Sequence, residues 1–302
     1  MSGILVIGSI NTDISISVDK APKIGETVRG KNYLVSPGGK GANQAIAAAH
    51  FGKDVSMIAL AGNDSHGDLC VNNLKANGIN TDGVGRCDTN TGVAVITVVG
   101  GDNFIILDEG ANKLVTVDYI KSKKDIIEKC DYVVFQFEIP LPVVFETIKY
   151  VKSLGKKVVL NPAPIYDIPE EIYKLIDIFI LNEHEAGQVL GCDVDVNNAE
   201  AAVSQIVKKG IDKVVITLGG EGSVYNDGDI IKKKPARKVK VVDTTAAGDT
   251  FIGAFCTSLC NGKDVNEAVE FATCASAITV SRMGAADSIP TYKEVTEYMQ
   301  NN

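Results

Sequence analysis

The chain has 302 residues, 45% of them hydrophobic and 23% charged, and its formal net charge is −8 at neutral pH. This composition is typical of a globular protein, and the negative charge argues against nucleic acid as a partner because binding a polyanion requires clustered Lys and Arg. No apolar stretch approaches the roughly 20 residues of a membrane-spanning helix, and the seven cysteines contain no CxxC pair. We therefore expect a cytoplasmic protein with reduced thiols and no membrane partner.

Short runs of β-branched residues recur along the chain and alternate with amphipathic segments. The runs predict buried strands at Ile4–Ile7, Val55–Ala59, Asp131–Phe135, Lys157–Leu160, Ile178–Leu181 and Lys213–Thr217. Between the first two, Ala42, Ala45 and Ala49 repeat with helical spacing. This alternation predicts an α/β fold with a doubly wound, mainly parallel sheet flanked by helices, and such sheets bind ligands at the carboxyl ends of their strands. We assign residues 1–302 to this single domain.

Residues 12–36 and 92–107 do not follow this strand–helix alternation, and their side chains alternate between apolar and polar. Such alternation predicts strands with one exposed face, and Gly100–Asn103 in the second segment is a hairpin signal. We expect these segments to form a small antiparallel β lid that is inserted in the domain and covers the site.

The segment Val241–Phe251 combines small residues with a carboxylate. We expect a strand to end at Asp243, followed by a tight turn and the start of a helix. Free N–H groups of Ala246–Gly248 at the start of this helix would bind phosphate and stabilise developing negative charge. Asp249 in the first turn is placed to act as a general base; the alternative is a carboxylate that caps the helix.

A second dense motif is the glycine-rich stretch Gly38–Gln44, which leads directly into a predicted helix. Its backbone allows a ligand to approach closely, although a glycine-rich stretch on its own is often a plain turn. Lys40 is not followed by Ser or Thr, so the stretch is not a Walker A loop. No G-x-G-x-x-G follows the first strand, which disfavours a nicotinamide dehydrogenase.

Two further motifs follow predicted strands. Thr217–Gly222 is a glycine-rich turn, and Asn182 and Glu185 come directly after the strand that ends at Leu181. Both lie where a nucleotide binds an α/β sheet. The alternative for Asn182 is a helix N-cap, with Glu185 completing a capping box, and the residues alone leave both interpretations open.

In this order the motifs resemble those of the ribokinase-like carbohydrate kinase family, and the similarity covers essentially the whole chain. The matching segments are Gly8–Asp13, Gly25–Val28, Gly38–Gln44, Asn161–Pro164, Asn182–Glu185, Thr217–Gly222 and Asp243–Phe251. The third and the last of these are the most specific in combination.

The resemblance implies transfer of the γ-phosphoryl group of ATP to O5 of D-ribose, with Asp249 as the base. The implied anion hole consists of the amides of Ala246, Ala247 and Gly248. The implied sugar contacts are Asn11, Thr12, Asp13, Gly39, Lys40, Gly41, Ala42, Asn43, Glu138 and Asp249. The implied ATP contacts are Asn182, Thr217, Leu218, Gly219, Gly220, Glu221, Gly222, Gly248 and Thr273.

The resemblance also implies two kinds of cation and a second subunit. Mg²⁺ is expected near Glu185, largely through water because this ion retains much of its hydration. A monovalent cation, K⁺, is expected at Asp243, Thr245, Thr279, Arg282, Gly284 and Ser288. The lid strands of this family pair between subunits, so a homodimer through the lid is implied.

Two alternatives to ribose phosphorylation stay open. One is a kinase of the same fold that acts on another small sugar or nucleoside, such as deoxyribose, fructose, 2-keto-3-deoxygluconate, adenosine or pseudouridine. The other is a non-catalytic sugar- or nucleotide-binding protein, which the presence of Asp249 with its whole anion-binding turn disfavours.

Overall fold

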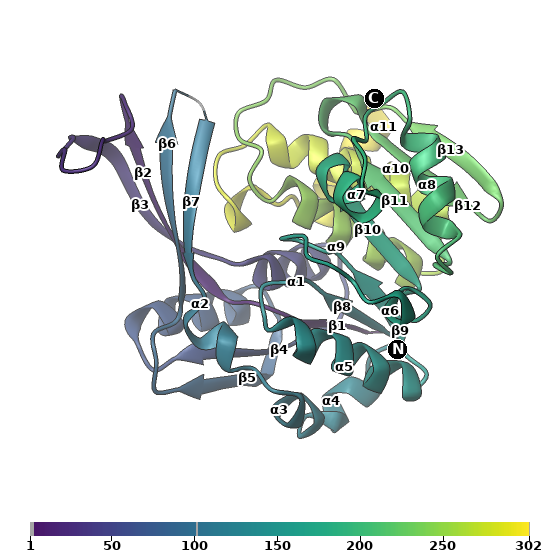
Figure 1. The fold of residues 1–302 in the computed structure, drawn as a ribbon, viewed down its shortest axis with the longest axis horizontal. Coiled ribbons are helices and arrows are strands. Elements are labelled where there is room, and N and C mark those ends of the chain that lie inside the picture. The colour runs from purple at the N-terminus through teal and green to yellow at the C-terminus, as the bar shows by residue number, and fades with distance from the viewer. Residues whose placement is uncertain (1–2, 101, 302) are drawn as a thin grey trace.

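The computed structural model describes residues 3–100 and 102–301. Within these ranges the strands form a nine-stranded central sheet and a separate four-stranded sheet, which are seen in Figure 1. The strands are β1 (Ile4–Ile7), β2 (Asn11–Val18), β3 (Gly30–Gly38), β4 (Val55–Gly62), β5 (Asn80–Cys87), β6 (Gly92–Val99), β7 (Asp102–Asp108), β8 (Tyr132–Phe135), β9 (Lys157–Leu160), β10 (Ile178–Asn182), β11 (Lys213–Thr217), β12 (Ser223–Asp227) and β13 (Ile230–Lys234). The helices are α1 (Lys40–His50), α2 (Ser65–Ala76), α3 (Val117–Lys121), α4 (Lys124–Glu128), α5 (Leu141–Ser153), α6 (Glu170–Tyr173), α7 (Glu183–Leu190), α8 (Ala199–Val207), α9 (Ala247–Cys260), α10 (Val265–Val280) and α11 (Tyr292–Asn301), with short 3-10 helices η1 (Gly110–Leu114), η2 (Gly219–Glu221) and η3 (Ala286–Ser288).

The central sheet has the strand order β13-β12-β11-β10-β9-β8-β1-β4-β5. The pairings from β11 through β5 are parallel, whereas β12 pairs antiparallel with both β11 and β13. All six apolar runs predicted as buried strands are present in this sheet, and β1, β9 and β11 have the predicted bounds. The doubly wound, mainly parallel sheet is therefore confirmed.

Helices cover both faces of the central sheet and bury a hydrophobic core on each. In β1, Ile4 and Val6 belong to the core formed with α1, α2, α9, α10 and α11, whereas Leu5 and Ile7 belong to the core formed with α3 to α8. Successive side chains of a strand alternate between faces, so a strand covered on both faces is apolar at every position. This is why the central strands are recognisable as continuous apolar runs.

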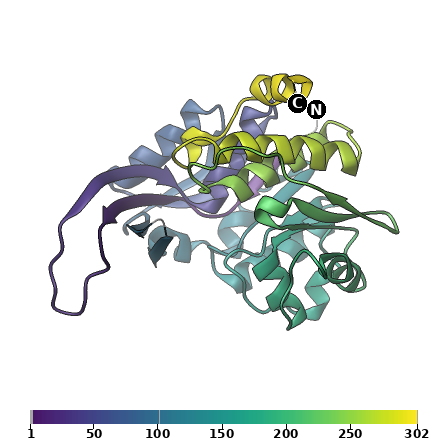
Figure 2. The ribbon, with the colours of Figure 1, turned by 90° about the horizontal axis from the view of Figure 1, so that it is seen from above.

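The four-stranded sheet, called the lid below, has the order β3-β2-β6-β7 and extends away from the central sheet (Figure 1). The connection between β2 and β3 projects further still, as the purple loop of Figure 2 shows. The predicted separate sheet is confirmed, but only its outer pairings are antiparallel: β2 and β6 run parallel, with Asn11 opposite Gly92. Both strands leave the main body at this same end, so they point in one direction. In the predicted hairpin turn, Gly101 lies outside the described residues.

The longest described helix, α10, has 16 residues. Among residues 3–100 and 102–301, none of the helices combines the length and the apolar character that crossing a bilayer requires.

Candidate active site

A pocket of about 240 Å³ lies at the carboxyl ends of β9, β10 and β11, beside the first turns of α1 and α9. It brings together residues that were expected at the base, the anion hole, the sugar, the nucleotide and Mg²⁺, namely Asp249, Ala246, Gly248, Lys40, Asn182, Thr217 and Glu185. Its other lining residues are Asn161, Ala163, Ile180, Leu181, Thr244 and Ile252. Segments far apart in the sequence therefore meet at the sheet edge where a parallel α/β fold binds ligands.

The segment before α9 is not a strand, contrary to the prediction. Residues 235–244 are irregular, and β13 ends directly before Pro235, which has no N–H to donate to a strand ladder. The N–H groups of Val242 and Asp243 donate instead to the carbonyl of Val280 at the end of α10. The turn that leads into α9 is therefore held by a helix end and not by the sheet.

Two of the three predicted amides at the start of α9 are available to an anion. The N–H of Ala247 donates to the carbonyl of Thr244 at 3.2 Å, whereas those of Ala246 and Gly248 donate to no acceptor among the described residues. Ala246 has a left-handed backbone with φ of 60°, a conformation that is strained for a residue with a Cβ and that is often found at ligand sites. The turn thus leaves unpaired N–H groups on two residues that line the pocket.

Asp249 is 8% exposed and does not cap α9. The N-cap residue is Ala246, which makes no side-chain cap. The carboxylate of Asp249 accepts hydrogen bonds from α1 instead: Asn43 Nδ2 lies 3.2 Å from Oδ2, and Gln44 Nε2 lies 3.0 Å from Oδ1. Its place in the first turn therefore serves the pocket and not the capping of its own helix.

A glycine brings α1 and α9 close enough for these hydrogen bonds. Gly253 follows Asp249 by one helical turn, and a Cβ added to it would lie 2.5 Å from the Cβ of Ala47 and 2.7 Å from the backbone N of Ala48. Any side chain there would push the two helices apart. The amides of Asn43 and Gln44 thus reach the Asp249 carboxylate because Gly253 lets the two helices lie in close contact.

Lys40 interacts electrostatically with four carboxylates, those of Asp13, Glu138, Glu185 and Asp249. Burial raises the pKa of Asp13 to about 7, and the charges of Glu138 and Asp249 act in the same direction. Burial likewise raises the pKa of Glu138 and that of Glu185. Burial alone would lower the pKa of Lys40, but the surrounding carboxylates together raise it. Lys40 is therefore a stable positive charge, while Asp13 titrates near neutral pH.

The glycine-rich stretch is fixed by hydrogen bonds within the protein. The N–H of Lys40 donates to Glu138 Oε2 at 3.1 Å, and those of Gly41 and Ala42 donate to the hydroxyl and carbonyl of Ser9 at 3.2 and 3.1 Å. These amides were expected to contact the sugar directly, but the half-buried carboxylate of Glu138 already accepts the hydrogen bond of the Lys40 N–H at the start of α1, as anions do at helix N-termini. The N–H groups of Lys40, Gly41 and Ala42 therefore already have acceptors within the protein.

The side chains of the first three residues of β2 lie on opposite faces of the strand. The Asn11 side chain accepts from Asn112 Nδ2 at 2.7 Å and approaches Glu138 Oε2 at 3.5 Å. Asp13 lies on the same face, because side chains alternate along a strand. The Thr12 hydroxyl lies on the other face, 3.4 Å from Cys70 Sγ. Of the predicted triplet, the side chain of Thr12 is therefore directed away from the site.

The predicted nucleotide residues are only partly brought together. Asn182 and Glu185 form the capping box that was the alternative interpretation, with the N–H of Glu185 2.8 Å from Asn182 Oδ1 and the N–H of Asn182 2.9 Å from Glu185 Oε2. Both still line the pocket with Thr217. The turn 218–222 follows directly and is exposed at Gly219, Gly220 and Glu221, whereas Leu218 is buried. Thr273 does not line the pocket, and its hydroxyl donates to a carbonyl of its own helix at 2.7 Å.

Asp243 connects three of the predicted cation positions. Its Oδ1 accepts from the N–H and the hydroxyl of Thr245 at 2.9 and 2.6 Å, and its Oδ2 accepts from the N–H of Gly284 at 3.0 Å. Burial opposes ionisation of Asp243, but these hydrogen bonds outweigh it and lower the pKa of the carboxyl. The other positions are Thr279, whose carbonyl accepts from the N–H of Arg282, and Ser288, whose hydroxyl donates to Ala285.

Sequence reasoning missed the buried polar side chains that support the site, namely Ser9, Gln44, Asn112, Gln136 and Asn161. For three of these residues the sequence contained a signal that could have identified them. Gln44 and Asn161 lie inside motifs that were recognised, and Gln136 directly follows the apolar strand β8. A polar residue at the carboxyl end of a buried strand is a candidate for the site because only a specific partner offsets the loss of its hydration.

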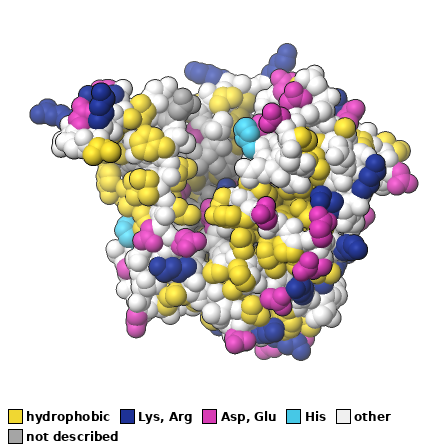
Figure 3. All heavy atoms as spheres, viewed as in Figure 1, with side chains coloured by type: hydrophobic (Ala, Val, Ile, Leu, Met, Phe, Trp, Pro, Cys, Tyr) yellow, Lys and Arg dark blue, Asp and Glu magenta, His cyan; other side chains and the backbone are white. Residues whose placement is uncertain are grey.

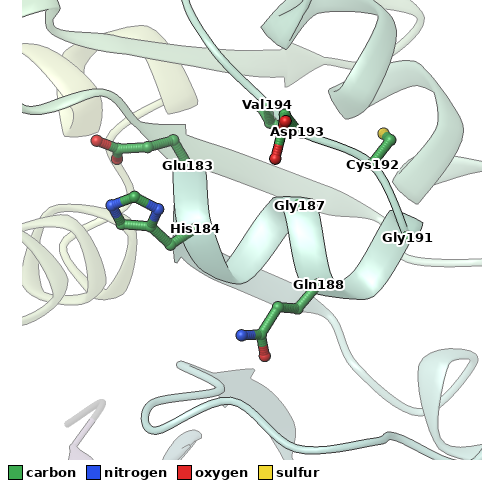
Figure 4. A pocket seen from close by; sticks show the side chains of 8 residues that line it. All are labelled: Glu183, His184, Gly187, Gln188, Gly191, Cys192, Asp193 and Val194. Atoms are coloured by element: carbon green, nitrogen blue, oxygen red, sulfur yellow. The ribbon is translucent and has the colours of Figure 1, made fainter.

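A larger hollow of about 770 Å³ lies on another side of α7, against the turn at residues 191–194. Figure 4 shows Glu183 and His184 at the start of the helix and Cys192 on the turn that follows it. None of its lining residues was assigned to the site. We place the active site in the smaller pocket, because charged side chains and unpaired helix N–H groups converge there and size alone indicates no chemistry.

Comparison with known proteins identifies the family. The profile of the pfkB family of carbohydrate kinases matches residues 1–292. Ribokinase of Bacillus subtilis (strain 168) is 40% identical over 300 residues, 99% of this chain and 100% of that protein, and deoxyribokinase of Salmonella typhi is 35% identical over 99% of each. The structure of Arabidopsis thaliana ribokinase complexed with ribose and ATP has a TM-score of 0.92 at 32% identity, covering 99% of each chain. The chain therefore belongs to the pfkB family of carbohydrate kinases.

Proposed function

We propose that the protein transfers the γ-phosphoryl group of ATP to O5 of D-ribose. The observation that carries the proposal is the Asp249 carboxylate, which lies in one pocket with the unpaired N–H groups of Ala246 and Gly248. A base for the hydroxyl and donors for the phosphoryl group are thereby next to each other, as phosphoryl transfer requires. The ribokinases of Bacillus subtilis and Arabidopsis thaliana support ribose and ATP as the substrates.

Polar side chains with free bonding capacity would hold the sugar. Asn43 uses its Nδ2 for Asp249, which leaves its buried Oδ1 without a hydrogen-bond partner. A buried unpaired acceptor is costly, and a sugar hydroxyl would satisfy it. Asp13 and Glu138 add carboxylate acceptors beside Lys40. Paired donors and acceptors suit a polyol, because each hydroxyl both donates and accepts.

In the proposed mechanism each group acts at one place on the reacting atoms. Asp249 accepts the proton of the C5 hydroxyl as its oxygen attacks the γ-phosphorus. The N–H groups of Ala246 and Gly248 bind the oxygens of the transferring group, where negative charge must be stabilised. Lys40 supplies a fixed positive charge between the carboxylates and the pocket that would take the phosphates.

Cations complete the proposal. The buried carboxylate of Glu185 faces the same pocket, which fits a Mg²⁺ ion held through water; when bound, Mg²⁺ neutralises phosphate charge. For K⁺ the proposal rests on the Asp243 carboxylate, whose lowered pKa keeps it ionised and which holds two other expected cation positions, Thr245 and Gly284, by hydrogen bonds. Chelation with EDTA is expected to abolish turnover, and replacing K⁺ by Na⁺ at equal ionic strength is expected to lower it.

We also propose a homodimer through the lid. Strand β7 forms an edge of the lid and exposes four consecutive apolar side chains, from Phe104 to Leu107, of which Ile105 and Ile106 are 57% and 65% exposed. Figure 3 shows apolar side chains gathered over the lid and a hollow between the lid and the main body. Light scattering is expected to give a dimer for the wild type and a monomer for Ile105→Asp; a monomeric wild type would contradict the proposal.

A panel of acceptors tests the substrate. ADP release is measured with ribose, deoxyribose, fructose and adenosine at matched Mg²⁺ and K⁺, and ribose is expected to give the highest kcat/KM. Deoxyribose is the most demanding competitor, since a deoxyribokinase is 35% identical to this chain. If kcat/KM is higher for deoxyribose or fructose than for ribose, that sugar is the preferred substrate. The proposal that the protein is a kinase would then still hold.

The raised pKa of Asp13 predicts how sugar binding depends on pH. With its pKa at about 7, the free carboxyl is mainly neutral below this pH and mainly ionised above it. The ionised form accepts hydrogen bonds from two hydroxyls, so kcat/KM for ribose is expected to rise about tenfold from one pH unit below to one above this pKa. In Asp13→Asn, kcat/KM is expected to be lower and to lose this rise; an unchanged rise would assign the titration to another group.

A further inference from the structure

Gln44 connects the proposed base to a chain of buried amides. It is 1% exposed, and its Nε2 donates to Asp249 Oδ1 at 3.0 Å and to Asn161 Oδ1 at 3.2 Å. Its Oε1 accepts from Gln136 Nε2 at 2.6 Å. Every polar atom of this side chain therefore has a partner within the protein, and none is left to contact a ligand.

The direction of this amide chain is set by the main chain of β10. Asn161 Nδ2 donates to the carbonyl of Ile180 at 3.0 Å, and a carbonyl only accepts, so the Oδ1 of Asn161 must face Gln44. At the other end Gln136 Nε2 donates to Gln44 Oε1, whereas Gln136 Oε1 has no hydrogen-bond partner among the described residues. Turning the Gln44 amide over would set its Oε1 against two acceptors, Asn161 Oδ1 and Asp249 Oδ1. Its NH₂ group is thus held toward Asp249.

This orientation matters because the surroundings of Asp249 are mostly negative. One positive charge, Lys40, and three carboxylates interact electrostatically with Asp249: Asp13 from β2, Glu138 from the segment after β8, and Glu185 from α7. Hydrogen bonds donated to a carboxylate favour its ionised form. Gln44 supplies one at Oδ1 and Asn43 the other at Oδ2.

We propose that Gln44 is a positioning residue whose hydrogen bond keeps the Asp249 carboxylate turned toward the acceptor hydroxyl, with Asn161 fixing the direction of the Gln44 amide. The inference rests on the proposed function, since it concerns the base of that reaction. A base acts only while it is ionised and aligned with the proton it receives. Gln44 would therefore affect the pH dependence of the chemical step without touching the sugar or ATP.

Gln44→Glu tests this with almost no change in shape. The introduced carboxyl keeps an acceptor for Gln136 but replaces the donor at Asp249 Oδ1 by an oxygen, and two carboxylates at this distance resist ionising together. The acid limb of the kcat–pH profile is expected to move up by about 1 to 3 pH units. At saturating sugar this profile reports the bound complex, so KM for the sugar is expected to change less than kcat.

A second variant and a control separate positioning from stability. Gln44→Met has a similar length but no donor, and its acid limb is expected to move in the same direction with a lower kcat. Asn226→Asp is the matched control: Asn226 is also buried, at 3% exposed, and its amide bonds to Val214 and Asp212 far from the pocket. This control is expected to lower Tm and to leave the acid limb where it is in the wild type.

The outcomes distinguish this inference from the proposed function. The profiles are measured with the acceptor that the wild type uses best, so a substrate other than ribose revises the function and still tests Gln44. If the wild type is active and both Gln44 variants keep the acid limb of its kcat–pH profile at the same pH, the positioning role of Gln44 is wrong and the proposed function stands. A wild type that phosphorylates no acceptor overturns both.

Discussion

Asp249→Ala is expected to lower kcat by about 10²- to 10⁴-fold, which is the usual contribution of general acid–base catalysis. The carboxylate is 8% exposed, lies in the pocket with the unpaired amides of Ala246 and Gly248, and accepts both of its hydrogen bonds from α1. Ribose binding is expected to be largely retained, because Asp13 and Glu138 supply acceptors of their own. Steady-state kinetics for kcat and calorimetry for ribose affinity measure the two effects separately.

Asp264→Ala is the matched control for this variant. Asp264 is also an aspartate at the start of a helix, but its side chain caps α10 by accepting from the N–H of Glu267 at 2.8 Å. Its loss is expected to cost about 1 kcal/mol of stability and to leave kcat unchanged. If Asp249→Ala behaved in the same way, with normal kcat and a lower Tm, Asp249 would be a structural residue and the proposed mechanism would be wrong.

Gly248→Val is expected to lower kcat by about 10²-fold, comparable to the loss of one oxyanion-hole donor. Gly248 is in the first turn of α9, and a Cβ added to it would meet no protein atom within 4 Å. Packing therefore does not require glycine here, and its φ is not in the left-handed region. The open space is where the proposed phosphoryl group would lie, and a branched side chain would fill it.

The thermal stability of the Gly248 variants is expected to stay the same or to increase, although their kcat falls. Glycine in a helix is up to about 1 kcal/mol less favourable than alanine, and valine is intermediate, so neither substitution at Gly248 should destabilise the fold. Gly248→Ala is expected to give a smaller loss of kcat than Gly248→Val, with an equal or higher Tm for both by thermal unfolding. A lower Tm that accounts for the loss of activity would contradict an empty phosphate space at this position.

The sequence alone determined the elements whose pattern is local. Apolar runs such as Ile4–Ile7 identify strands buried on both faces, alternation at 12–36 and 92–107 identifies the lid, and the order of the motifs identifies the family. These signals are local because a strand or helix repeats every few residues. The position of Asp249 in a first helical turn also followed from its own neighbours.

Only the tertiary structure decided what those residues bond to. The sequence predicted a strand up to Asp243 and an all-antiparallel lid. The folded chain instead attaches the Asp243 segment to the end of α10 and pairs β2 with β6 in parallel. Each outcome depends on groups distant in sequence, whose approach is fixed by packing of whole elements and leaves no local pattern.

The hydrogen bonds of the base are the clearest case. Asn43 and Gln44 stand next to each other in a motif that the sequence made conspicuous, yet nothing local indicates that their amides reach Asp249, 206 and 205 residues away. That contact exists because Gly253 lets α9 lie against α1. The sequence therefore singled out Asp249 as the candidate base, and helix packing decided which groups hold its carboxylate in place.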